Sequence, residues 1–382
     1  MSRKRKHGAR LGAAVLAAAL AALAGTVYLR GTAEPASPEA TAPQETPSPT
    51  IIPSPTPEPT AEPTPSPTPS PEPETEYFVL SFVGDCTFSS TADIRDYSGS
   101  FESVVGDDLT YPFAATVQYF ADDYLSIANL EGTFTTATLS SGALFAFKAD
   151  SAYAGILPAG SIELVTLGNN HSGNYLEQGL SDTKDALDAV GVAYAENDGC
   201  YLYESGGGPK IGVYSKLFPT AAQVTAGVAA LQEAGADIII AALHWGDEGK
   251  YRPTADQQAI GHAAIDAGAD IVYGSHPHVL QPVETYGDGY IFYSLGNWSF
   301  GGNTAPRDRD TAIIQITVAR EPDGTLSLSE ATCIPCCVSG TDGVNDYQPC
   351  PYEAGTEDYD RAMSKLNGTF TGEDLTINYS YD

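Results

Sequence analysis

Five short polar motifs each follow an apolar, strand-like run of the chain. They are Gly84-Asp85, Asn129-Leu130-Glu131, Gly168-Asn169-Asn170-His171, His244-Trp245-Gly246 and Gly274-Ser275-His276-Pro277-His278. Ligands of α/β proteins gather at the carboxyl ends of strands, so motifs from distant parts of the chain can meet there in one site. Carboxylates, an amide oxygen and several imidazoles that meet in this way form a metal centre with oxygen and nitrogen ligands. The pattern therefore predicts a metal-dependent enzyme or a relic of one.

Most of these motifs also have a structural explanation when they are taken alone. Gly84-Asp85 fits an ordinary turn, the motif ending at Glu131 fits a helix cap, and His244 fits a hydrogen-bonded core histidine. His276-Pro277-His278 is harder to explain, because two histidines one residue apart lie on the same side of an extended segment. Every histidine of the folded region except His262 lies in a strand-end motif. His262 is expected on a helix, as a surface residue or as a neighbour of a ligand.

Other hydrolytic and nucleotide-binding chemistries have little support. The run Gly206-Gly207-Gly208 precedes Pro209 and a strand, with no Lys-Ser pair or helix after it, so it is a loop and not a phosphate cradle. The chain contains neither a Gly-x-Ser-x-Gly motif nor a catalytic-cysteine signature. Serine or cysteine hydrolase chemistry is therefore not expected.

The elements that must position these motifs alternate between strands and helices. Strands are expected over residues 78–83, 124–128, 162–167, 211–214, 238–243, 271–273, 290–295, 312–318 and 326–331, the last two joined by a turn at 322–324. Helices are expected over residues 114–121, 176–190, 221–234 and 255–267. Strands dominate the second half of the chain without long helices between them. We therefore expect an α/β domain in which two sheets pack together with helices outside.

The N-terminal 31 residues read as a signal peptide or a membrane anchor. Five basic residues between positions 3 and 10 precede residues 11–29, which carry no charge. A run of this length can just span a bilayer, whereas Ala22-Leu23-Ala24 before Gly25 resembles a cleavage site. We favour an uncleaved anchor, with the basic side cytoplasmic and the rest of the chain extracytoplasmic and tethered to the membrane; cleavage would give a secreted protein.

Residues 32–76 are rich in Pro, Thr, Ser, Glu and Ala and nearly free of apolar side chains. Nothing in this composition offsets the entropy lost on ordering, so we expect a disordered, polyproline-like linker. At about 3.1 Å per residue, some 40 residues would reach roughly 120 Å. This length suits a tether that lifts a domain away from a membrane, although a plain linker of no particular length is the alternative.

The remaining residues, 77–382, suffice for one large domain, of which 77–340 carry the motifs and 341–382 form an extension packed on it. The chain has 49 acidic and 18 basic residues, and six of the basic ones lie in the first 30 positions. Such a surface argues against nucleic acid as a partner. Cys333, Cys336, Cys337 and Cys350 are expected to form one or two disulfides. Cys86 is expected to be a small buried residue, with metal ligation or pairing to Cys200 as alternatives.

The ordered motifs resemble a known family, the CapA-type proteins of poly-γ-glutamate (capsule) biosynthesis, within the metallophosphatase or calcineurin-like phosphoesterase superfamily. The similarity runs from about residue 77 to residue 335. The matching stretches are 82–85, 128–132, 167–171, 244–248, 266–270, 274–281 and 293–297. The resemblance implies a four-layer α/β/β/α sandwich with a metal centre at the edge of the sheets.

The resemblance also implies the roles of individual residues. The metal ligands it implies are Asp85, Glu131, Asn170, His244, His276 and His278. They would hold one or two divalent transition-metal ions, Mn, Zn or Fe, since hard cations favour carboxylate oxygen and imidazole suits these metals. Such a centre can lower the pKa of water toward neutrality. His171 would protonate the leaving group as a general acid.

Two positions depart from the superfamily pattern. Asp85-Cys86-Thr87 stands where typical phosphoesterases have Asp-x-His, so a threonine replaces the second ligand and one metal would be weakly held or absent. Asn174 stands where the family commonly has an aspartate three residues after the histidine of the Asn-Asn-His motif. If that acid orients the histidine, proton transfer through His171 is impaired. No phosphate-clamping arginine lies near any motif, so specificity for phosphate esters does not follow.

Two functions fit these observations. The first is an extracytoplasmic metal-dependent hydrolase that cleaves a phosphoester or an amide in a cell-envelope polymer, within poly-γ-glutamate or capsule synthesis or processing. The second is a non-catalytic accessory or anchoring subunit of a polymer synthesis or export complex, which Thr87 and Asn174 favour. An acidic domain repels a polyanionic polymer unless divalent cations bridge them, so any contact should depend on metal.

Overall fold

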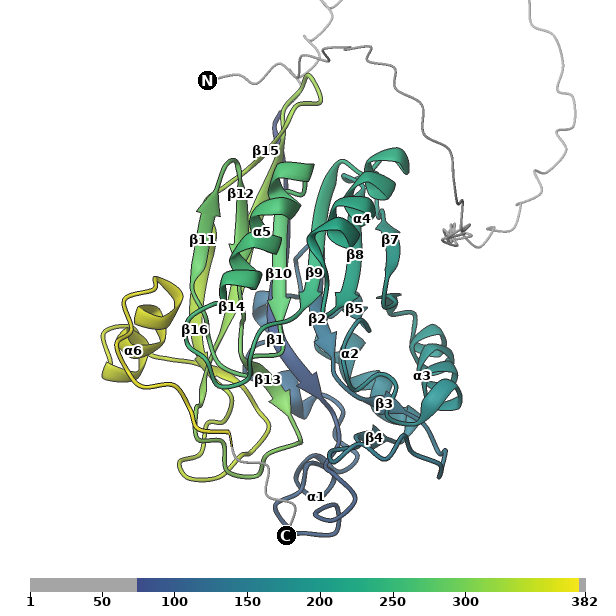
Figure 1. Cartoon of the computed structure of the whole chain (residues 1–382). Helices are drawn as coiled ribbons and strands as arrows, with labels where there is room; N and C mark the ends of the chain where they lie inside the picture. The colour runs from purple at the N-terminus through teal and green to yellow at the C-terminus, as the bar shows by residue number, and fades with distance from the viewer. Residues whose placement is uncertain (1–73, 378–382) are drawn as a thin grey trace, which may run out of the picture.

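The computed structural model describes residues 74–377 (Figure 1). The expected membrane segment, 1–31, and all but the last three residues of the expected linker, 32–76, lie outside these residues. Within residues 74–377, no helix combines the length and the apolar character needed to cross a bilayer.

The larger sheet contains the first strand of the domain at its centre. Its strand order is β17-β16-β14-β1-β2-β5-β6, with β13 beside β1 and β15 beside β14. The bounds are β1 (Glu76–Thr87), β2 (Leu125–Leu130), β5 (Leu164–Thr166), β6 (Ala193–Ala195), β13 (Asn297–Phe300), β14 (Asp310–Arg320), β15 (Leu326–Leu328), β16 (Thr332–Cys337) and β17 (Cys350–Pro351). β1, β2, β5 and β6 run parallel, so their carboxyl ends share one edge.

The second sheet has the order β11-β12-β10-β9-β8-β7. The bounds are β7 (Gly199–Tyr203), β8 (Ile211–Leu217), β9 (Ile238–His244), β10 (Ile271–Ser275), β11 (Val283–Tyr286) and β12 (Gly289–Phe292). β8, β9, β10 and β12 are parallel, and only the two edge strands run against their neighbours. β9 is buried along its whole length, as its continuous apolar run predicts.

Three hydrophobic clusters show that the molecule has four layers. Between the two sheets, alternate residues of β1 such as Phe82 pack against residues of the second sheet such as Ile240. The other face of β1, with Val83, packs against the helical segments that include α1 (Phe101–Val105), α2 (Ile156–Ala159) and α3 (Leu176–Val190). The outer face of the second sheet packs against α4 (Ala221–Glu233) and α5 (Ala255–Ala267) (Figure 1). The predicted α/β/β/α order of layers is present.

Both long helices on the second sheet begin at a capping box. Thr220 and Gln223 cap α4, and Thr254 and Gln257 cap α5 in the same reciprocal manner. The boundaries of α3 and α5 agree with those expected from the sequence, since apolar periodicity and turn residues coincide there.

The helix expected over residues 114–121 is absent. The chain forms two short 3-10 helices instead, Tyr111–Phe113 and Val117–Tyr119. Pro112 lies in the first turn of the first of these, and Thr116 between them leaves helical geometry with a φ of −133°. The Thr116 hydroxyl donates to the carbonyl of Phe113, which is the competition with helical backbone bonding that disfavours threonine inside helices.

The C-terminal region adds β16, β17 and helix α6 (Glu357–Leu366), which packs beside β14 and β16. All six cysteines, which lie within the described residues, are free thiols, so the expected disulfides are not formed in the structure. Cys337 and Cys350 are nevertheless partners across two antiparallel strands, with their Sγ atoms 2.9 Å apart. Cys86 is fully buried in the core, as expected, and it belongs to a different hydrophobic cluster from the one that Cys200 contacts.

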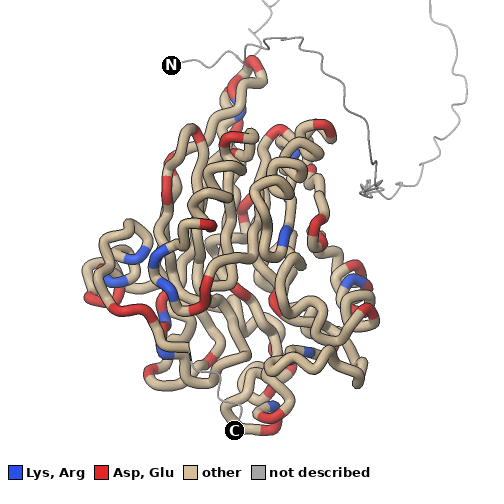
Figure 2. Tube along the Cα trace, in the orientation of Figure 1, with Lys and Arg blue, Asp and Glu red and all other residues tan. Residues whose placement is uncertain are grey.

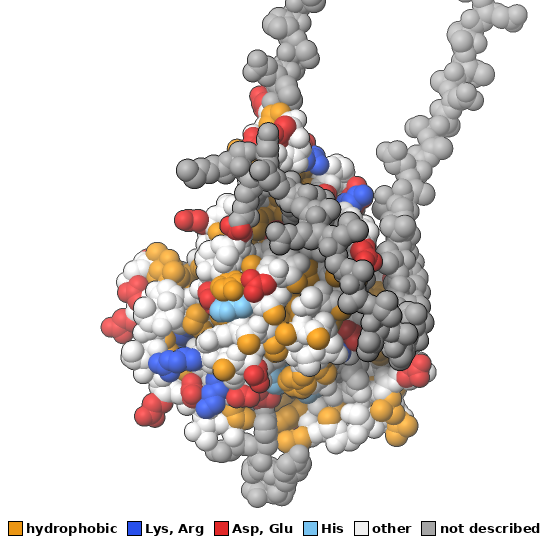
Figure 3. Space-filling view, turned by 45° about the horizontal axis from the view of Figure 1, so that its top comes forward, with side chains coloured by type: hydrophobic (Ala, Val, Ile, Leu, Met, Phe, Trp, Pro, Cys, Tyr) orange, Lys and Arg blue, Asp and Glu red, His pale blue; other side chains and the backbone are white. Residues whose placement is uncertain are grey.

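Acidic residues are spread over the whole domain, whereas lysine and arginine are few (Figure 2). The face shown in Figure 3 likewise presents more Asp and Glu side chains than basic ones.

Candidate metal centre

The strand-end motifs converge at the edge where the two sheets meet. Asp85 is paired in register with Asn129 of β2 on one side and with Asn297 of β13 on the other. In the second sheet His244, the last residue of β9, is paired with Ser275, the last residue of β10. The carboxyl ends of parallel strands therefore bring these motifs together, as the strand-end pattern predicts.

Glu131 lies at the centre of this cluster, fully buried, directly after β2. Its Oε1 lies 3.7 Å from His171 Nε2, 3.8 Å from His244 Nε2 and 3.6 Å from His278 Nε2. Neither carboxylate oxygen has a hydrogen-bond partner among the described residues. A buried carboxylate without partners costs free energy, so its place at the focus of three imidazoles calls for an explanation.

Asp85 is also fully buried, but its oxygens are partnered. Oδ1 accepts from the Asn129 side-chain amide at 2.9 Å, and Oδ2 accepts from the backbone N–H of His276 at 3.1 Å. The Nδ1 atom of His278 lies 3.3 Å from Oδ2. Asp85 thus ties the first sheet to the loop that follows β10.

His244 and Asn170 contact each other across the two sheets. His244 Nε2 lies 2.7 Å from Asn170 Oδ1, and His244 Nδ1 lies 2.8 Å from the Ser275 hydroxyl. Asn170 is exposed whereas His244 is buried. The amide oxygen and the imidazole therefore converge from opposite sheets on the opening of the site.

His276 and His278 lie on a turn and not on the extended segment expected from the sequence. Their φ angles are +99° and +55°, which non-glycine residues rarely adopt. The two rings remain close, with centroids 5.9 Å apart, and the His276 ring lies 4.7 Å from that of His244. The expected geometry was wrong, but the turn still brings both imidazoles to the same cluster. Backbone strain of this kind persists where surrounding contacts hold it.

His171 is held beside the cluster by Asn174. Its Nδ1 lies 2.9 Å from Asn174 Oδ1, which also accepts from the backbone N–H of Phe147. Since an amide oxygen only accepts, Nδ1 carries the hydrogen and Nε2, which faces Glu131, is the atom that can gain or lose a proton. Asn174 therefore orients His171 as an aspartate would, but without the charge.

Thr87, which stands at the expected place of a second ligand, is used otherwise. Its hydroxyl donates to the backbone carbonyl of Glu131 at 2.7 Å. The side chain therefore fixes the backbone that carries the central carboxylate.

Three buried or half-buried amides, Asn129, Asn169 and Asn297, take part in the site although the sequence pattern predicts no role for them. Asn129 donates to Asp85, and its Oδ1 accepts from Thr166 and from Asn169. Asn297 contacts Nδ1 of His278 through its Oδ1 at 2.8 Å. Their place at strand ends beside the acidic motifs was the available signal. His262 of α5, by contrast, pairs with Glu284 of β11 and makes no contact with the clustered side chains.

The electrostatics of the cluster are unfavourable as it stands. Burial raises the pKa of Glu131 well above its usual value and lowers the pKa of His244 well below it. Burial likewise lowers the pKa of His276 to about 4. Burial opposes the charged form of His278 too, but the Glu131 carboxylate and Asp85 raise its pKa to about 10. Metal ligands bind in their deprotonated forms, so the lowered pKa values of His244 and His276 favour ligation, whereas Glu131 and His278, whose pKa values are raised, hold protons that a cation must displace.

The arrangement fits a divalent metal ion on three counts. Glu131, His276 and His278 offer ligand atoms within 4.8 Å of one another, and so do Asp85, Glu131 and His244. Glu131 is common to both groups, and its two oxygens lack other partners. His276 Nδ1 is also buried without a partner among the described residues. Carboxylate and imidazole donors together suit Zn, Mn or Fe.

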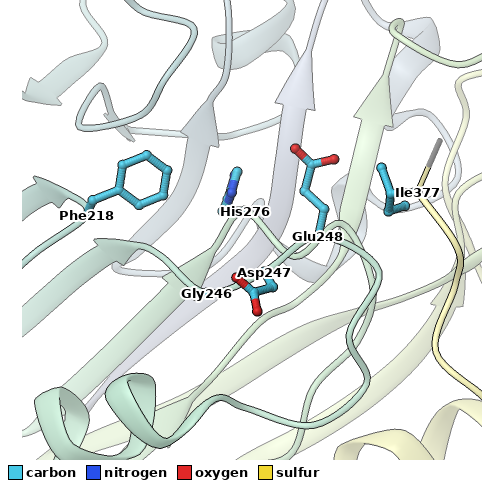
Figure 4. A pocket seen from close by; sticks show the side chains of 6 residues that line it. All are labelled: Phe218, Gly246, Asp247, Glu248, His276 and Ile377. Atoms are coloured by element: carbon cyan, nitrogen blue, oxygen red, sulfur yellow. The ribbon is translucent and has the colours of Figure 1, made fainter. Parts of the chain in front are cut away.

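A cavity of about 570 Å³ opens beside the cluster. It is lined by Phe218, Gly246, Asp247, Glu248, His276 and Ile377. Figure 4 shows His276 between Phe218 on one side and Glu248 and Ile377 on the other. Among the described residues that line it, none is a lysine or an arginine.

The chain is similar to proteins of capsule synthesis. It shares 33% identity over 195 residues with the PGA biosynthesis protein CapA of Bacillus subtilis (strain 168), covering 44% of this chain and 51% of that protein. It shares 28% identity over 198 residues with a probable polyglutamine synthesis accessory protein of Mycobacterium tuberculosis (strain CDC 1551 / Oshkosh), covering 42% and 52%. The chain thus spans about half the length of these curated relatives.

Among solved structures, the NAD nucleotidase of Haemophilus influenzae is similar over 80% of this chain and 65% of its own, at 13% identity and a TM-score of 0.38. Similarity at this TM-score supports no conclusion about the fold or the function of this chain. The family model described as bacterial capsule synthesis protein PGA_cap matches residues 79–198 and 203–301, which is more than half of the chain and includes every candidate ligand. The chain therefore belongs to the bacterial capsule synthesis family PGA_cap.

Proposed function

We propose that the protein acts outside the cytoplasm in the synthesis or processing of poly-γ-glutamate or a related capsule polymer, as a metal-dependent hydrolase. The observation that carries this proposal is Glu131, a fully buried carboxylate that faces three imidazoles and has no hydrogen-bond partner for either oxygen within residues 74–377. Burying these groups together lowers the stability of the folded protein unless a cation compensates for the buried charge. The site is therefore suited to binding a cation. The polymer in this proposal is taken from the names of the relatives, and the location outside the cytoplasm is taken from the predicted N-terminal membrane segment.

One or two ions would be held by the six side chains named as ligands. The six are Asp85, Glu131, Asn170, His244, His276 and His278. A divalent ion held there would polarise the scissile phosphoester or amide and lower the pKa of water. His171 would move the proton at Nε2, since Asn174 occupies its Nδ1. The cavity beside His276 is the place for the substrate, and its carboxylates Asp247 and Glu248 disfavour a bare polyanion.

A second function, an accessory or anchoring subunit of a polymer synthase or export complex, is favoured by two observations. The Thr87 hydroxyl donates to the Glu131 carbonyl and so supplies no metal ligand. Asn174 lacks the negative charge that would assist proton transfer through His171. The Mycobacterium tuberculosis relative is itself named as an accessory protein. In this case the metal would bridge the acidic domain to the anionic polymer.

Turnover assays separate the two functions. The full chain is loaded with Mn, Zn or Fe and tested on bis(p-nitrophenyl) phosphate and on a γ-glutamyl peptide. The hydrolase proposal expects turnover with at least one metal, lost in His171→Gln and retained in His262→Ala, since His262 lies outside the cluster. If no metal supports turnover and deletion of the protein abolishes polymer in the cell, the accessory function is correct and the hydrolase is rejected.

A further inference from the structure

The C-terminal segment 369–377 lies along the loop 246–252, which carries the carboxylates of the cavity. This segment follows α6 and falls outside the residues matched by the family model, which end at 301. Its final described residue, Ile377, lines the cavity together with Glu248 and His276 (Figure 4). The segment is therefore part of the surroundings of the candidate metal centre.

Gly249 links this segment to the histidine turn, residues 276–278, because its backbone carbonyl bonds to the segment and its backbone N–H bonds to the turn. Its carbonyl accepts from the backbone N–H of Leu375 at 2.9 Å, and its own N–H donates to the carbonyl of Pro277 at 2.8 Å. Pro277 stands between His276 and His278. Gly249 has a φ of +72°, and a Cβ there would lie 2.9 Å from the Leu375 carbonyl oxygen, so glycine is required for this close approach.

Asp374 fastens the segment to the same loop with a second pair of contacts. Its Oδ1 accepts from the backbone N–H of Tyr251 at 3.0 Å, and its Oδ2 lies 3.2 Å from Lys250 Nζ. Arg252 also donates to the carbonyl of Phe370 at 3.1 Å. The loop is thus held along most of its length by the C-terminal segment.

The segment is itself anchored in the body of the domain. The buried Lys365 of α6 forms ion pairs with Asp308 and Asp310 at 2.7 Å, and its ammonium lies over the rings of Tyr251 and Phe370. The carbonyl of Thr376 accepts from Arg307 at 2.8 Å. These contacts make the segment a fixed support and not a loose tail.

The histidine turn needs such support, because His276 and His278 both have positive φ angles. A backbone in this region relaxes unless its surroundings hold it. Besides the contact of Asn297 with the His278 ring, two hydrogen bonds hold the backbone of the turn: the Asp85 carboxylate accepts from the His276 N–H, and the Gly249 N–H donates to the Pro277 carbonyl. The first belongs to the site and the second depends on the C-terminal segment.

We propose that the C-terminal segment 369–377 is a positioning element of the metal centre, which acts through Gly249 to hold His276 and His278 in place for a cation. The inference rests on the proposed function only in taking these two histidines as ligands. It adds a contribution from a part of the chain that the family match does not cover. Residues that support metal ligands typically contribute 10- to 100-fold to metal affinity.

Isothermal titration of the metal-free full chain with Mn²⁺ and with Zn²⁺ tests this inference. Asp374→Ala removes the hydrogen bond from the Tyr251 N–H and the ion pair with Lys250, and it is expected to weaken metal binding about 10-fold. Asp374→Asn keeps an oxygen that can accept from the Tyr251 N–H, so it is expected to weaken metal binding less than Asp374→Ala does. Glu76→Gln is the matched control: it removes a partly exposed carboxylate paired with Arg320 at the opposite end of β1 and is expected to bind metal as the wild type does.

Gly249→Ala attacks the same link from the loop side and is expected to weaken metal binding as well. Hydrogen exchange of residues 274–280 in the metal-free protein should quicken in Asp374→Ala and Gly249→Ala but not in Glu76→Gln. Wild-type affinity in both variants would overturn the inference, even if their melting temperatures fall, because a merely structural role lowers stability alone. Absence of metal binding by the wild type would instead overturn the proposed function.

Discussion

Replacing Asn174 with aspartate tests how the site controls its proton-transferring residue. In the wild type, burial lowers the pKa of His171 to about 4, and the largest opposing effect is the hydrogen bond that His171 donates to Asn174. Because Asn174 Oδ1 is neutral, it orients the imidazole but does little for the imidazolium. Asn174→Asp keeps an acceptor for His171 Nδ1 and for the backbone N–H of Phe147, and it adds a negative charge about 3 Å from the ring.

The expected size of the effect follows from this contact. An opposite charge within hydrogen-bonding distance shifts a pKa by about 1–3 units, which corresponds to roughly 1.4–4 kcal/mol of preference for the charged form. The sign is upward, because the carboxylate stabilises imidazolium. The pKa of His171 should therefore rise from about 4 to between about 5 and 7.

Nuclear magnetic resonance of the imidazole C–H signals, followed against pH in the metal-free protein, measures this pKa directly. Asn367→Asp serves as the control, since it adds the same charge at an exposed position after α6. It should leave the pKa of His171 unchanged. A pKa of His171 that stays near 4 or falls in Asn174→Asp would refute the assignment of Asn174 as the group that orients this histidine.

Two further predictions concern stability and thiol chemistry. Burial raises the pKa of Glu163 from 4.5 to about 7; the folded state therefore holds more protons than the unfolded state between these values, and the free energy of unfolding falls as pH rises through this window. Glu163→Gln, which keeps an acceptor for the Ser126 N–H, should be more stable than the wild type at pH 8 by about 2 kcal/mol after allowance for partial exposure. Urea titrations at pH 5 and pH 8 check this, and a variant less stable than the wild type at pH 8 would contradict it. Excess oxidised glutathione should join Cys337 to Cys350, whose Sγ atoms are 2.9 Å apart, and peptide mass spectrometry that found a bridge through Cys333 or Cys336 instead would contradict it.

The order of strands and motifs could be predicted because both signals are local. The continuous apolar run of β9 is visible in the sequence, and residues directly after neighbouring parallel strands must share an edge of the sheet. For that reason the sequence alone predicts that the motifs containing Glu131, His244 and His276 meet at one site.

What the sequence did not reveal depends on contacts between distant segments. The turn at His276 and His278 was expected to be extended, because nothing in the tripeptide signals positive φ; the contacts from Asp85 and Gly249 impose it. The helix expected over 114–121 was wrong because Thr116 interrupts it. The supporting role of the C-terminal segment is likewise tertiary, since Asp374 and Tyr251 are far apart in the chain.

Side chains from both sheets are expected to hold a divalent transition metal between them. The decisive measurement is the metal content of the purified wild type and of a His276→Ala, His278→Ala double variant, with His262→Ala as the control that removes an imidazole elsewhere. Bound Mn, Zn or Fe is expected in the wild type and in His262→Ala, and none in the double variant. Equal metal content in the wild type and the double variant would show that these histidines are not ligands.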